Sequence, residues 1–148
     1  MGEHKEYFLG IDFGTQGVRC GVVNGVGEVL SVAHRKYNTY YPEPGWVVQK
    51  PDEWIEAMFE AAKDCLQKTD ESVVKRIVGI SVCATASTVI PVLKNGTALM
   101  DAILWMDNRA SLETSGINQT KHEVLKHCGN EVAVEWLIPK ALWLKNNR

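Results

Sequence analysis

Apolar and β-branched residues form short runs in the first part of the chain, and glycine-containing turns separate them. The runs cover residues 7–13, 18–24 and 29–37, with turns at Gly14-x-x-Gly17 and Gly25-x-Gly27. Runs of this length joined by tight turns are typical of antiparallel strands. The pattern therefore predicts an antiparallel meander over residues 7–37.

After Pro51 the apolar spacing changes to three and four residues, which predicts a helix that ends near Lys68. Pro51 suits a first helical turn, and acidic residues behind it suit the positive end of the helix dipole. The residues expected to form the buried face are Trp54, Ile55, Met58, Phe59, Ala62 and Leu66. The near-continuous apolar run at 77–82 then predicts a strand buried on both faces, with the helix as the crossover to a parallel strand.

The second half of the chain is less regular. Strands are predicted at 88–93 and 102–106 with an Asn95-Gly96 turn between them, and an irregular helical segment begins at Ser111. Pro139 suits the first turn of a final predicted helix, and the apolar pattern of this helix continues to Arg148. Antiparallel meander, helix and parallel strand is the order of a ribonuclease-H-like α/β core. We expect residues 1–148 to be the N-terminal portion of a longer protein.

Charge and composition narrow the function classes. The formal net charge is −2 and the basic residues are scattered, so no nucleic-acid-binding surface is expected. No apolar run approaches membrane-spanning length, and residues 1–6 are too polar for a signal peptide, so no membrane association and a cytoplasmic location are predicted. The four cysteines lack C-x-x-C spacing, which favours their use as small apolar residues over a disulfide or zinc framework.

The turn between the first two strands carries candidate chemistry. Gly14-Thr15-Gln16-Gly17 precedes a strand, whereas the phosphate loops of P-loop and dinucleotide-binding proteins precede a helix. A tight hairpin flanked by glycines can still present backbone N–H groups and the Thr15 hydroxyl to a phosphate, and Asp12 would hold Mg²⁺ beside it. The alternative is a plain hairpin turn in which Asp12 caps backbone donors. These residues alone leave both interpretations open.

Four segments together carry a family resemblance. "GIDFGTQGVR" resembles the first phosphate motif of the actin-like ATPase superfamily. "PGWVVQKPDEW", "ILWMDNRA" and "IPKALWLKNN" are similar, in this order, to segments of the FGGY family of carbohydrate kinases. The resemblance covers nearly the whole chain. One departure is Val48, which stands where the family usually has Glu.

The resemblance implies an actin-like ATPase fold and a carbohydrate kinase that transfers the γ-phosphate of ATP, with Mg²⁺, to a sugar or polyol hydroxyl. It implies Asp12 as the metal residue and a phosphate- and nucleotide-binding set of Gly14, Thr15, Gln16, Gly17 and Arg19. Arg19 on an alternating strand fits a solvated face equally well. The catalytic base and the adenosine site are expected beyond Arg148, so we expect the chain alone to be inactive. A homodimer of the full-length protein is compatible with the resemblance.

Substrate class depends on the loop after the apolar run at 77–82. Glycerol kinases carry an Arg-Glu pair there, whereas this chain has Thr85-Ala86 in a stretch closer to that of ribulokinases. The resemblance thus implies a pentulose, ribulose ahead of xylulose, and a substrate-binding set of Thr85, Ala86, Trp46, Gln49, Asp107 and Glu135. Trp54 and Trp105 are expected in the core. The alternative for Thr85 and Ala86 is simple packing of small residues at a strand end.

Two other function classes remain open at this point. An actin-like or chaperone-like ATPase module explains Asp12 and the glycine hairpin but not the segments around Trp46 and Asp107. A non-catalytic sugar-binding fragment explains the sugar-binding set without requiring phosphate transfer.

Overall fold

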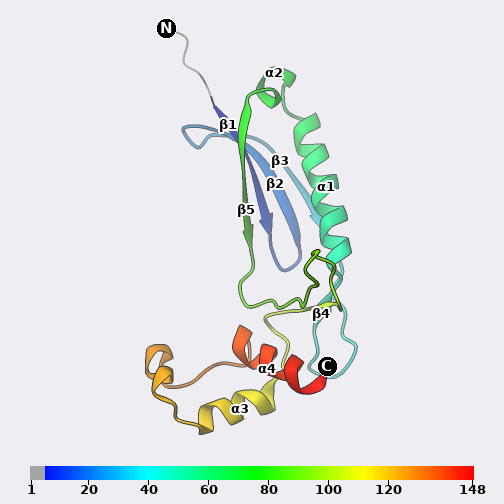
Figure 1. Ribbon diagram of the computed structural model, residues 1–148. Coiled ribbons are helices and arrows are strands. Elements are labelled where there is room, and N and C mark those ends of the chain that lie inside the picture. Colours follow the sequence, from blue (N-terminus) through cyan, green and yellow to red (C-terminus); the bar gives the residue numbers. More distant parts are fainter. Residues whose placement is uncertain (1–5) are drawn as a thin grey trace. The chain divides into compact units, whose positions relative to one another are not determined.

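The structure is a computed structural model that describes residues 6–148 and divides into two compact units (Figure 1). The first unit contains residues 6–38 and 52–85, and the second contains residues 39–51 and 86–148. Each unit has its own cluster of buried apolar side chains.

The first unit is built on a four-stranded sheet in the order β3-β2-β1-β5 (Figure 1). The strands are β1 (Tyr7–Phe13), β2 (Gly17–Asn24), β3 (Val29–Lys36) and β5 (Ile77–Ala84). β1 pairs with β2 and β2 with β3 in antiparallel fashion, whereas β1 pairs with β5 in parallel. The predicted meander and the parallel strand are therefore confirmed, and so is a mixed α/β sheet.

Helix α1 (Pro51–Gln67) forms the predicted crossover, with Asp52 and Glu53 in its first turn. Its buried residues are Ala57, Ala61 and Cys65, four residues apart. The predicted buried face is therefore partly wrong, since Phe59 and Ile55 are exposed while Met58, Ala62 and Leu66 lie at the margin of the core. Small side chains allow the helix axis to approach the sheet closely, but their weak hydrophobicity hides them from an apolar pattern. A short helix, α2 (Glu71–Val74), follows and begins where the Asp70 carboxylate accepts the Ser72 N–H.

Strand β5 is not buried on both faces, so this prediction is wrong. Val78, Ile80 and Val82 are 62%, 67% and 61% exposed. Within residues 6–148, β5 is an edge strand whose ladder partner is β1 alone. A continuous apolar run indicates that a strand suits burial, but it does not supply the layers that would cover it.

The second unit contains little sheet. β4 (Val48–Gln49) pairs with β6 (Ala102–Ile103), and the helices are α3 (Ser111–Gln119), the 3₁₀ helix η1 (Glu123–Cys128) and α4 (Leu137–Asn147). The predicted strand at 88–93 is wrong, because only isolated bridges join Val89 to Ile103 and Val92 to Ala98. Pro91 explains this, since it has no N–H to donate to a ladder. The Asn95-Gly96 turn and the first-turn position of Pro139 are confirmed.

A buried ion pair joins distant segments of the second unit. Arg109 Nε and Nη2 donate to the two carboxylate oxygens of Asp107, both at 2.8 Å, and the Val47 N–H also donates to this carboxylate. Asp107 is 0% exposed. The Arg109 guanidinium lies 3.9 Å from the centre of a Trp46 ring and 5.0 Å from that of Trp143. Residues 46–47, 107–109 and α4 are thereby linked through one ion pair.

Two further findings concern the described part of the chain. Residues 6–148 contain no helix that is both long and apolar enough to cross a membrane. Cys20, Cys65, Cys83 and Cys128 are free thiols, the first two of them buried.

The first prediction concerns the hairpin between β1 and β2. A Cβ atom at Gly17 would overlap the carbonyl oxygen of Arg35 and lie 2.5 Å from His34 Nε2. We therefore expect Gly17→Ala to lower the free energy of unfolding by about 1–3 kcal/mol. Gly14→Ala is the matched control, because its Cβ would lie at 3.4 Å from its nearest neighbour. Urea unfolding of both variants measures the difference, and equal losses would contradict the steric explanation.

The second prediction concerns the buried ion pair. Arg109→Met leaves the Asp107 carboxylate buried without its cation, so we expect a loss of about 3–5 kcal/mol in the free energy of unfolding. Lys75→Met is the control, because Lys75 and Glu71 form an exposed pair at 2.6 Å that we expect to contribute less than about 1 kcal/mol. Thermal and urea unfolding should give the same ranking. Comparable losses for both variants would show that the buried pair is not an anchor of the second unit.

Candidate functional site

The turn between β1 and β2 forms one side of an open hollow. The Gly14 N–H donates to the Gly17 carbonyl at 3.0 Å, which closes a two-residue loop of Thr15 and Gln16. Neither glycine has a positive φ, so Gly17 is required here for the close approach of β3 and not for a left-handed backbone. The hollow has a volume of about 490 Å³ and is lined by Gly14, Thr15, Gln16, Gly17, Arg19 and His34. All five predicted phosphate-binding residues therefore lie around one space.

Asp12 and Arg19 are direct neighbours across the β1–β2 ladder. Arg19 Nη2 lies 3.4 Å from Asp12 Oδ2, and the two side chains are 64% and 46% exposed. Arg19 is solvated and also lines the hollow, so its position is compatible with both predicted alternatives. His34 was missed by sequence reasoning, since only the pairing of β2 with β3 brings it next to Gly17.

The donor set of this edge fits Mg²⁺ held mainly by a nucleotide. Mg²⁺ is usually bound by one or two carboxylates together with phosphates and several waters. Asp12 offers one accessible carboxylate beside the hairpin. In the described residues no group of three or more His, Cys, Asp or Glu side chains could enclose a metal ion. Asp12 could therefore anchor a phosphate-bound Mg²⁺.

Tyr37 holds the hairpin through a hydrogen bond to its backbone. Its hydroxyl donates to the Gly14 carbonyl, and its ring lies 5.9 Å from that of Trp54. Burial raises the pKa of Tyr37 to about 12, and the negative charge of Asp12 adds to the effect. Tyr37 therefore remains a hydrogen-bond donor throughout the neutral pH range. Trp54, which was expected in the core, is only half-buried beside Tyr37 and is not part of the core cluster.

The end of β5 lies beside the same hairpin. β1 and β5 are parallel, and their last paired residues are Phe13 and Ala84. The N–H of the next residue, Thr85, donates to the Phe13 carbonyl at 3.1 Å. The carboxyl ends of parallel strands are where α/β sheets bind their ligands. Asp12, the hairpin and the exposed Thr85 thus share one edge of the first unit.

Ala86 begins the second unit and is exposed. The next residue, Ser87, has a left-handed φ of 64°. The Oγ1 atom of Thr88 is buried and has no hydrogen-bond partner in the structure. A non-glycine residue at positive φ and an unsatisfied buried hydroxyl are both uncommon, and they tend to occur at functional sites.

The other predicted sugar-binding residues lie in the second unit with different degrees of exposure. Trp46 and Glu135 are half-buried, whereas Gln49 is buried and donates from Nε2 to the Thr39 hydroxyl at 2.8 Å. Asp107 is fully buried, and its carboxylate receives protein donors from Val47 and Arg109. Contrary to the prediction, Trp105 is not a core residue, because it is 40% exposed.

Lys140 was also missed, although it stands in the "IPKALWLKNN" segment. It is 0% exposed, and its ammonium group donates to backbone carbonyls of the second unit. Burial lowers the pKa of Lys140 to about 8, while the charges of Asp107 and Glu135 oppose this shift. The signal that could have indicated its burial is its spacing on α4. Lys140 is one residue from Pro139 and three residues from Trp143, and both of these are buried.

Comparison with known proteins identifies relatives over nearly the whole chain. Residues 7–148 match the FGGY family of carbohydrate kinases, N-terminal domain. An FGGY carbohydrate kinase domain-containing protein of Homo sapiens is 33% identical over 99% of this chain and 28% of its own length. A xylulose kinase of Staphylococcus epidermidis is 33% identical over 97% of this chain and 28% of its own length.

A solved structure agrees with this match. The crystal structure of a xyloylose kinase from Brucella ovis superposes with a TM-score of 0.87 at 26% identity, over 96% of this chain and 30% of that one. The chain spans 28% of the length of both curated relatives named above. Because the family match extends from residue 7 to residue 148, this chain belongs to the FGGY family of carbohydrate kinases.

Proposed function

We propose that this chain supplies the first phosphate-binding hairpin and part of the sugar site of an ATP-dependent carbohydrate kinase. The observation that carries the proposal is the hollow around Gly14–Gly17, which lies at the same sheet edge as Asp12 and Thr85. Phosphate groups at this edge would be within reach of backbone dipoles and of the Arg19 guanidinium. Family membership supports the proposal independently.

The chemistry requires positioning and charge neutralisation more than covalent participation by the protein. Arg19 would offset phosphate charge, and the hairpin, held by Tyr37 and by the packing of Gly17 against β3, would keep its shape. Mg²⁺, when bound, would neutralise charge on the transferred phosphoryl group, and Asp12 is the residue that would hold it. No residue of this chain is assigned as the general base.

The proposed substrate is a pentulose. Thr85 and Ala86 are small and exposed at the strand end, and neither offers the charged groups of the Arg-Glu pair of glycerol kinases. The relative named xylulose kinase from Staphylococcus epidermidis is 33% identical, and one named D-ribulokinase, from Saccharomyces cerevisiae, is 30% identical. The sequence favoured ribulose, while the more similar named relatives favour xylulose, so both sugars belong in the test.

A cytoplasmic location, where ATP is available, and a homodimer stay predictions.

Membership of a carbohydrate kinase family favours sugar phosphorylation over a chaperone-like ATPase module. A non-catalytic sugar-binding protein is separated from a kinase by the test of Asp12. The experiments use the full-length kinase, meaning the longer protein that we propose contains this chain.

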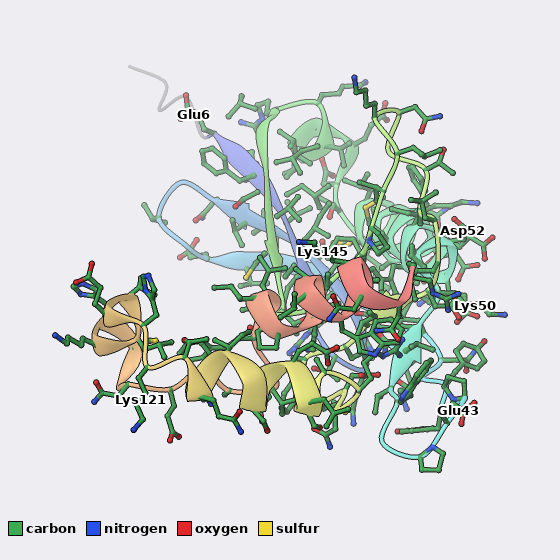
Figure 2. The ribbon with its side chains drawn as sticks, turned by 60° about the horizontal axis from the view of Figure 1, so that its bottom comes forward. Glu6, Glu43, Lys50, Asp52, Lys121 and Lys145 are labelled. Atoms are coloured by element: carbon green, nitrogen blue, oxygen red, sulfur yellow. The ribbon has the colours of Figure 1, made fainter. Side chains whose placement is uncertain are left out.

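The third prediction concerns Asp12. In the full-length kinase, Asp12→Asn removes the charge that would hold Mg²⁺, so we expect kcat to fall on the order of 10²- to 10³-fold. Unfolding temperature should change little, because Asp12 is half-exposed. Asp52→Asn, an exposed acid in the first turn of α1 that is labelled in Figure 2, is the control. Coupled ADP detection measures turnover, and near-normal activity of Asp12→Asn would reject the metal assignment.

The fourth prediction concerns substrate choice. We expect ribulose or xylulose to be phosphorylated at far lower concentration than glycerol or erythritol, because the loop lacks charged groups that grip a small polyol. Ala86→Leu should raise the ketose KM about 10- to 200-fold, the range for a misfitted apolar group, and leave the ATP KM unchanged. Ala141→Leu, at an exposed position of α4, is the control. Glycerol as the best substrate, or no effect of Ala86→Leu, would refute the pentulose assignment.

A further inference from the structure

Lys140 connects separate segments of the second unit through its ammonium group alone. Nζ donates to the carbonyl oxygens of Leu104 at 2.7 Å, Glu135 at 2.9 Å, and Ser87 and Trp105 at 3.1 Å. These carbonyls come from the loop after β5, from the segment after β6 and from the residues before α4. An ammonium group has three protons, so the four acceptors share them.

Burying the Lys140 ammonium group to hold backbone segments has a high cost in desolvation free energy. A buried ammonium group loses its hydration, and a carboxylate partner normally compensates for the loss. Among the described residues Lys140 has no carboxylate within ion-pair distance, and its contacts are neutral carbonyls. Apolar side chains of similar volume often replace buried charges without loss of stability. Packing alone therefore does not explain a lysine at this position.

The carbonyls that Lys140 holds belong to unusual parts of the chain. Ser87 has a φ of 64°, which a serine adopts only when its surroundings impose it. Its neighbours are the exposed Ala86 and Thr88, whose buried hydroxyl has no partner. Trp105 is half-exposed although its carbonyl is anchored. Lys140 thus fixes the backbone at two places from which side chains reach outward.

We propose that Lys140 is a positioning residue for the sugar: it fixes the backbone of the Ala86–Thr88 loop and of Trp105 without contacting the substrate. The inference deepens the proposed function and rests on it. The hairpin of Gly14–Gly17 is held by contacts within the first unit, so loss of Lys140 should affect the sugar and not ATP.

The first test replaces Lys140 in the full-length kinase. Lys140→Met keeps an unbranched side chain that is one heavy atom shorter, and it removes every donor. Because a displacement of about 1 Å can cost about 10²-fold in rate, we expect the ketose kcat/KM to fall about 10- to 100-fold, mainly through KM. The ATP KM should stay within about twofold of the wild-type value, as expected for an unaltered phosphate hairpin.

Lys145→Met is the matched control. Lys145 is an exposed lysine on the same helix and is labelled in Figure 2. Its replacement should leave both KM values unchanged. Equal changes in the ketose and ATP KM of Lys140→Met, or no change in either, would overturn the positioning role.

A second measurement decides the question if Lys140→Met does not fold. The charged groups that face Lys140 are Asp107, Glu135 and Arg109. Because burial lowers the pKa of Lys140 to about 8, the ammonium loses a proton above this pH and keeps two N–H donors for its acceptors. In the wild-type enzyme we expect the ketose KM to rise at least about threefold between about pH 7 and 9.5, while the ATP KM stays constant.

The outcomes separate the two proposals. Absence of phosphorylation of every sugar tested by the wild-type protein would reject the proposed function and, with it, the role of Lys140. An active wild-type enzyme whose ketose KM responds neither to Lys140→Met nor to pH would reject the role of Lys140 alone.

Discussion

The second unit depends on one buried ion pair, Asp107 with Arg109. Its two strands are two residues long each, so a sheet ladder contributes little to its order. The pair is bidentate, receives the N–H of Val47, and lies against the rings of Trp46 and Trp143. A charge pair buried in this way constrains geometry more than it adds stability, because desolvation offsets most of its attraction. It therefore explains why segments far apart in the sequence adopt one arrangement.

Three of the sequence segments that resembled a kinase family contact one another in the second unit. The segment around Trp46, the Asp107-Asn108-Arg109 segment and the helix of Lys140 and Trp143 all meet there. Their polar residues mainly hold backbone: Asp107 holds Val47, and Lys140 holds Ser87, Leu104, Trp105 and Glu135. These motif residues thus order the backbone of the second unit through contacts within the protein.

Sequence patterns predicted the first unit better than the second for a physical reason. Alternation and tight turns define β1, β2 and β3 locally, and helical spacing defines α1. The exposure of β5 and the small-residue face of α1 depend on what lies next to them, which no local pattern contains. The hairpin and the gathering of its residues around one hollow were predictable because these residues are contiguous in the sequence. The burial of Asp107 and the carbonyl contacts of Lys140 were not, because they join residues up to 60 positions apart.

The two halves of the proposed reaction are anchored by different means. The proposed phosphate hairpin is held by the Tyr37 hydroxyl, which donates to the Gly14 carbonyl, and by the close approach of Gly17 to the Arg35 backbone, all within the first unit. The sugar loop is held by Lys140 and the left-handed Ser87, within the second. Under the proposed function, a change in the loop should alter the preferred sugar while the hairpin, which is held within its own unit, keeps its shape.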